Sequence, residues 1–91
     1  MTLDALPGGD LIEAGLADLS RGRASVEALL VSIGAPRLRR IGIDVPAEIS
    51  NPEEKLYERL AEGDPDSAHS RYNALIRRLV SFERAAECAA R

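Results

Sequence analysis

Residues 64–88 read DPDSAHSRYNALIRRLVSFERAAEC. The apolar residues of this segment recur at intervals of three and four, which places them on one face of an α-helix. The pattern predicts a long C-terminal helix over about residues 65–88, with Asp64 as its N-cap. Such a helix is about twice the average length. Its predicted apolar face consists of Ala68, Tyr72, Leu75, Ile76, Leu79, Phe82 and Ala86.

The first predicted helix, counted from the N-terminus, covers residues 10–21. Asp10 is a favourable N-cap, and Glu13 lies three residues later, where a capping-box partner belongs. Gly22 is typical of the left-handed residue that ends a helix. Gly15 lies within the apolar stripe, and a glycine on a buried face lets a second helix approach closely.

Residues 24–33 form the next predicted helix. They are apolar around almost the whole circumference, which indicates a buried, central helix. Gly34 is expected to end this helix, and Pro36 occupies the position that a first helical residue favours. The sequence therefore predicts a separate, short helix over residues 36–41.

These two helices and the turn between them resemble, over residues 25–41, a DNA-binding helix-turn-helix. The resemblance implies a DNA-binding regulator in which the second helix contacts the nucleic acid. The candidate basic patch on that helix consists of Arg37, Arg39 and Arg40.

The next helix is predicted to begin after Asn51 as the N-cap, with Pro52 in the first position, and to end at Gly63. Because almost no chain separates it from the C-terminal helix, the two should pack as a hairpin or an abrupt corner. No segment predicts a β-sheet. The predicted fold is all-α, a small bundle of four to five helices in a single domain over residues 1–91, with residues 1–9 as a loose lead-in.

The composition excludes several classes of protein. The single cysteine, Cys88, excludes an internal disulfide, and no apolar run reaches the roughly 18 residues that span a membrane. The N-terminal residues lack the basic and apolar regions of a signal peptide. We therefore expect a cytoplasmic protein, and eleven arginines against one lysine favour a GC-rich bacterial genome.

Charge is distributed unevenly along the chain. The net charge of −3 argues against general affinity for nucleic acid. Residues 1–20 and 44–66 are acidic, whereas residues 21–43 and 67–91 are basic. These blocks either pair within the fold or across a dimer, or they are ordinary solvated helix faces.

The sequence offers no constellation of catalytic, metal-binding or cofactor-binding residues. His69 is the only histidine, and no nucleophile or second base can be assigned to it. The acidic residues form neither a calcium-binding loop nor a Glu-x-x-His pair. We therefore expect a protein without enzymatic activity and without a cofactor.

Glu83 is the acidic residue with the most unusual position. By helical spacing it falls among the apolar residues that face the core, and a buried carboxylate must be paired or protonated. Its partner is expected to be Arg37, Arg39 or Arg40, or a residue of a second subunit. The alternative is that the helix has left the core by this turn, so that Glu83 lies in water.

The long C-terminal helix also motivates a functional hypothesis. At 24 residues it would be about 36 Å long, whereas a domain of this size is about 30 Å across. The C-terminal end should therefore extend beyond the domain by about one turn, where it either frays or packs on another surface, most commonly in a two-fold homodimer. We thus expect a protein that acts by protein–protein interaction, in particular self-association, with DNA binding as the alternative. The candidate interface consists of Tyr72, Leu79, Phe82, Glu83 and Ala86.

Overall fold

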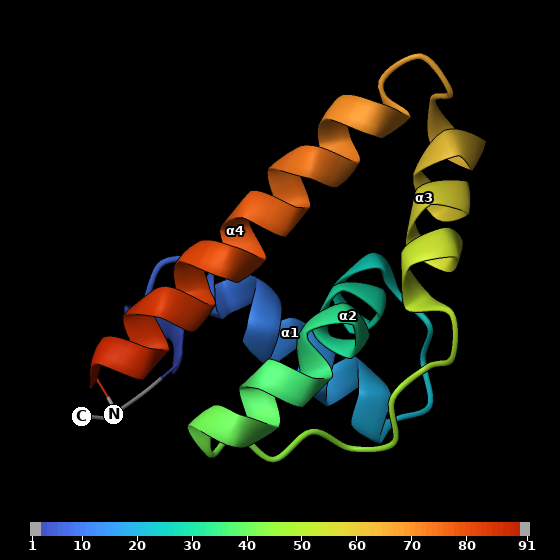
Figure 1. Ribbon diagram of the computed structural model, residues 1–91. Helices are drawn as coiled ribbons and strands as arrows, with labels where there is room; N and C mark the ends of the chain where they lie inside the picture. Colours follow the sequence, from blue (N-terminus) through green and yellow to red (C-terminus); the bar gives the residue numbers. More distant parts are fainter. Residues whose placement is uncertain (1–2, 90–91) are drawn as a thin grey trace.

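The computed structural model describes residues 3–89, and all regular structure in this part of the chain is helical (Figure 1). The all-α class is therefore confirmed, and four α-helices fall within the predicted number. The elements are η1 (Leu3–Ala5), α1 (Gly9–Ser20), α2 (Val26–Ile41), α3 (Pro52–Gly63) and α4 (Ala68–Ala89).

Helix α2 is the centre of the bundle, because α1, α3 and α4 all pack against it. A buried central helix was predicted, but the predicted break at Gly34 is wrong. Residues 26–41 form one uninterrupted helix that contains Pro36. An internal proline disfavours a helix by about 3 kcal/mol, and burial of α2 on several sides outweighs that local preference. The segment 25–41 is consequently not a helix-turn-helix.

Both ends of α2 carry recognisable caps. The Oγ of Ser25 accepts a hydrogen bond from the Ala28 N–H at 3.0 Å, so the helix begins two residues later than the predicted start at Ala24. Gly42 follows the last helical residue with φ at 103°, a left-handed conformation that glycine adopts without strain.

Gly34 is a point of contact between α2 and α4. A Cβ atom at this position would lie 2.8 Å from Leu79 Cδ1 and 3.2 Å from Glu83 Oε2. The glycine therefore lets two α4 side chains rest directly on the backbone of α2.

Helix α1 crosses α2 at Gly15, as the sequence predicted. A Cβ atom at Gly15 would lie 2.5 Å from Val31 Cγ2 and 2.8 Å from the carbonyl carbon of Glu27. Real Cβ atoms do not approach other heavy atoms so closely, so the two helix backbones are nearer than any other residue type would allow.

The predicted N-cap of α1 is wrong. Gly8, with φ at 75°, precedes the first helical residue and has no side chain to act as a cap. Asp10 lies exposed in the first turn, and Arg78 Nη2 donates a hydrogen bond to its Oδ1 at 3.2 Å. Leu3 and Leu6 pack against the core, so residues 3–9 are attached to the fold rather than a loose lead-in.

Helices α3 and α4 form the predicted hairpin (Figure 1). α3 buries only a narrow face, Leu56 and Leu60. Asn51 precedes it as predicted but makes no capping bond through its side chain. α4 begins at Ala68 instead of residue 65, because residues 64–67 form a turn and Asp64 ends α3.

The end of α4 that extends from the core is the N-terminal one. The molecule measures 40 × 25 × 18 Å, and α4 runs along one whole side of it (Figure 1). Near the C-terminal end, Phe82 and Ala86 are 0% and 2% exposed, so the expected extension of that end is wrong. The N-terminal half of α4 instead pairs with α3 to form a two-helix arm.

Candidate interaction surface

The predicted basic patch is dispersed around α2. Arg37 points towards α4, whereas Arg39 points towards the segment after α2. Residues two apart on a helix lie on nearly opposite sides, so a single continuous helix cannot gather these side chains on one face. Arg40 is exposed.

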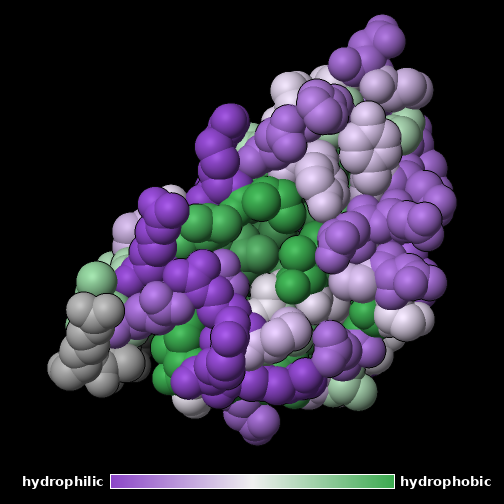
Figure 2. Space-filling model, in the orientation of Figure 1, coloured by the Kyte–Doolittle hydropathy of each residue, from purple (hydrophilic) through white to green (hydrophobic). Residues whose placement is uncertain are grey.

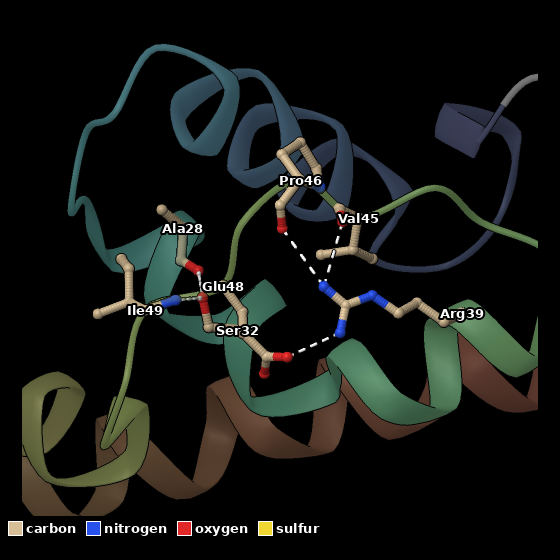
Figure 3. Close-up of polar contacts among 7 residues, drawn as sticks. All are labelled: Ala28, Ser32, Arg39, Val45, Pro46, Glu48 and Ile49. Carbon is tan, nitrogen blue, oxygen red and sulfur yellow. Dashed lines mark hydrogen bonds and ion pairs between the residues drawn. The ribbon is translucent and has the colours of Figure 1, made fainter.

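Arg39 holds the segment between α2 and α3 (Figure 3). Its Nη1 donates to Glu48 Oε1 at 2.7 Å, and its Nη2 donates to the Val45 carbonyl at 3.2 Å. The buried Ser32 also attaches this segment to α2. Its Oγ accepts a hydrogen bond from the Ile49 N–H at 3.0 Å and donates one to the Ala28 carbonyl at 2.9 Å. Arg39 thus has a structural role in this fold.

Glu83 is buried and paired, in agreement with one of the two alternatives that the sequence left open. Its side chain is 6% exposed, and its Oε1 lies 3.5 Å from Arg37 Nη1. Arg37 also donates from Nε to Glu87 Oε1 at 2.7 Å. Because burial disfavours the charged form, the pKa of Glu83 is raised above its ordinary value, although Arg37 partly offsets this effect.

Replacement of Glu83 by glutamine is expected to change how stability depends on pH. A carboxyl group with a raised pKa binds its proton more tightly in the folded state, so its ionisation destabilises the fold as the pH rises above about 4.5. Glu83→Gln removes this loss, and the variant should gain stability relative to the wild type as the pH rises above about 4.5. Urea unfolding at several pH values measures the difference.

Two observations would check that prediction. Glu58→Gln, which removes the charge of an exposed glutamate on α3, serves as the control and should not show the same gain. A constant difference in unfolding free energy between wild type and Glu83→Gln at all pH values would contradict the prediction.

Most of the predicted interface residues lie inside the chain's own core. Leu79, Phe82, Glu83 and Ala86 are all less than 5% exposed. Their side chains therefore cannot form a surface for a second subunit in this structure. Tyr72 alone remains half-buried and accessible.

A row of half-buried apolar side chains runs along the side of α4 that carries Glu83. Its members follow one another at intervals of four residues, and the last precedes Glu83 by three, so they share one side of the helix. On α2, half-buried Ile33 lies one turn before Arg37. α2 and α4 run in the same direction past the Arg37–Glu83 pair (Figure 1), so Ile33 borders the row. The row consists of Tyr72, Ile76 and Val80.

Helix α3 completes this surface with an aromatic side chain. The ring centroids of Tyr57 and Tyr72 are 5.8 Å apart, and Tyr57 is 40% exposed, which is unusual for a large apolar residue. Figure 2 shows an apolar area in the middle of one side of the molecule, with hydrophilic side chains around it. We call this surface the apolar face and define it as Ile33, Tyr57, Tyr72, Ile76 and Val80.

Charged residues of opposite sign border the apolar face. Burial raises the pKa of the Tyr72 phenol, and the negative charge of nearby Glu53 on α3 adds to this effect. Glu53 and the following Glu54 form an acidic edge. On α4, Arg77 directly follows Ile76, and Arg84 lies two turns further along the same side, so these two exposed residues form a basic edge.

Sequence reasoning named only Tyr72 of the apolar face, because it treated the apolar residues of α4 as one face and did not divide them between the core and the surface. Val80 was left out of that face, although it follows Ile76 by four residues and widens the pattern on one side. The signal available in the sequence was the width of the apolar stripe of α4, which is broader than the part of the helix that faces the core.

The remaining features of the surface are weaker candidates. A shallow hollow of about 410 Å³ lies on the other side of α4, where Val26, Leu60 and Leu75 are bordered by Arg71 and Arg78. His69 Nε2 lies 3.2 Å from Asn73 Nδ2, and its ring meets the Tyr57 ring in a T-shaped arrangement.

Residues 3–89 contain no group of three metal-ligating side chains that could hold an ion. Within the same range, no helix is long and apolar enough to cross a lipid bilayer. Comparisons with protein-family models, with curated protein sequences and with solved structures found no match to this chain.

Proposed function

We propose that this protein is a non-enzymatic, cytoplasmic interaction domain that associates with a second copy of itself through the apolar face. The observation that carries the proposal is a group of half-buried apolar side chains around the exposed Tyr57, between two oppositely charged edges. Apolar centres with charged borders are typical of protein–protein interfaces, and two-fold homodimers are the commonest assemblies.

The aromatic residues of the apolar face support a protein partner. Tyr57 and Tyr72 come from different helices and already contact each other, so little conformational entropy would be lost when a partner covers them. Tyrosine is among the residues that contribute most to binding energy in interfaces.

No observation favours DNA binding over self-association. Arg37 and Arg39 are engaged with Glu83, Glu87 and Glu48. Their charges are therefore largely compensated within the chain, which weakens the attraction to phosphate that nucleic-acid binding requires.

Light scattering behind a sizing column tests the proposal. At low concentration the measured mass should approach the 9.8 kDa of one chain, and it should rise towards twice that value as the concentration increases. A mass of one chain at every concentration would contradict self-association.

A further inference from the structure

We propose that the two copies pack through the apolar face with their two-fold axis parallel to the axis of α4, so that α3 of each copy lies over α4 of the other. This inference rests on the proposed self-association and adds the orientation of the interface. It follows from the order of charges across the apolar face.

The charges change sign from one side of the apolar face to the other. The acidic edge, Glu53 and Glu54, lies on α3, and the basic edge, Arg77 and Arg84, lies on α4. All four side chains are exposed, and none forms an ion pair with another of the side chains that the structure describes. Each edge is therefore available to a charged surface of a partner.

Symmetry limits how two such faces can meet. If the two-fold axis runs parallel to α4, the acidic edge of each copy meets the basic edge of the other. If the axis runs across the apolar face from α3 to α4, like edges meet, and arginines face arginines. Like charges across an interface are strongly unfavourable, so the charge order selects the first arrangement.

The apolar residues are compatible with that arrangement. Tyr57 belongs to α3, whereas Tyr72, Ile76 and Val80 belong to α4. Placing α3 of one copy over α4 of the other brings the exposed ring of Tyr57 onto the apolar row of the second copy. Water is then excluded from both aromatic side chains at the centre of the interface.

Reversal of the basic edge tests the orientation. The double variant Arg77→Glu/Arg84→Glu would place glutamates opposite the acidic edge of the second copy. Its dissociation constant should increase at least about tenfold relative to the wild type. Arg71→Glu is the matched control, because this exposed arginine is on the same helix but borders the hollow on the other side. The control should dimerise like the wild type.

A complementary variant distinguishes loss of dimerisation by charge repulsion from loss of dimerisation by unfolding. Glu53→Lys/Glu54→Lys should also fail to self-associate, yet an equimolar mixture with the first variant should form a heterodimer, because both pairs of edges are then complementary. Thermal unfolding followed by circular dichroism establishes that each variant is folded before mixing. Ion-exchange chromatography distinguishes the heterodimer from either unmixed variant by its charge.

Salt dependence provides an independent measurement. With unlike edges in contact, the wild-type dimer should weaken as the ionic strength rises, because salt screens the attraction. If like edges were in contact, the wild-type dimer should instead strengthen as the ionic strength rises, because salt would screen the repulsion.

The outcomes distinguish the two proposals. A wild-type protein that never dimerises overturns the proposed function. A wild-type dimer that is unaffected by Arg77→Glu/Arg84→Glu, or that strengthens with salt, overturns only the orientation. Equal weakening by Arg71→Glu also overturns it, since net charge would then account for the effect.

Discussion

Replacement of Phe82 by alanine is expected to lower the free energy of unfolding by about 3–5 kcal/mol. Phe82 is the only phenylalanine of the chain and is 0% exposed. A domain of this size is stabilised by about 5–14 kcal/mol in total. The substitution should therefore remove a large fraction of the stability and leave a cavity that the surrounding helices cannot fill.

The location of Phe82 explains why the cavity would persist. Its Cβ lies close to Gly8, in front of the first turn of α1, and its neighbours on α4 rest against α2. Collapse around the missing ring would therefore disturb the packing of α1, α2 and α4 together.

Urea unfolding measures the effect of Phe82→Ala. The midpoint should move to lower denaturant with little change in the slope, since the area exposed on unfolding hardly changes. Ser81→Ala, an exposed neighbour on the same helix, is the control and should lie within about 0.5 kcal/mol of the wild type. A loss below about 1 kcal/mol for Phe82→Ala would mean that this part of α4 is not packed on the core.

Gly15→Ala is the second substitution with a large expected effect, a loss of about 1–3 kcal/mol. In an open helix the same change would stabilise by about 1 kcal/mol, because alanine is the better helix former. At Gly15 the added methyl group would overlap Val31 Cγ2 and the backbone of Glu27. A backbone carbonyl cannot rotate away, so α1 and α2 must separate.

Gly63→Ala is the comparison, because it is not expected to lower the free energy of unfolding. Gly63 is the last residue of α3, and the nearest atom to an added Cβ there is Arg71 Nη1 at 3.9 Å. This change should be neutral or stabilise by up to about 1 kcal/mol. If urea unfolding showed that Gly15→Ala, like Gly63→Ala, does not lower the free energy of unfolding, the close approach of α1 and α2 at Gly15 would be contradicted.

The sequence predicted the features that depend on local pattern. The all-α class, the close approach at Gly15 and the left-handed conformation of Gly22 follow from spacing and from the properties of glycine. The burial of Glu83 was one of two alternatives, because a helical wheel gives the direction of a side chain but not whether the core reaches it.

The features that were predicted wrongly depend on tertiary packing. Gly34 and Pro36 are local signals for a helix end, yet α2 continues through both because three helices pack on it. In α4, helical periodicity identified one face, but it could not show how that face is divided between the core and the surface. Leu79 and Phe82 were therefore assigned to an interface, although they are buried within the chain.

The central position of α2 has a consequence for cooperativity. α1 meets the other α-helices chiefly through α2, and the core residues form one cluster. A partly folded chain that lacks α2 could retain only the hairpin of α3 and α4 or the contact of η1 with α1, and neither encloses a core. Intermediates without α2 should therefore be sparsely populated, so that most of the chain gains and loses its structure in a single transition.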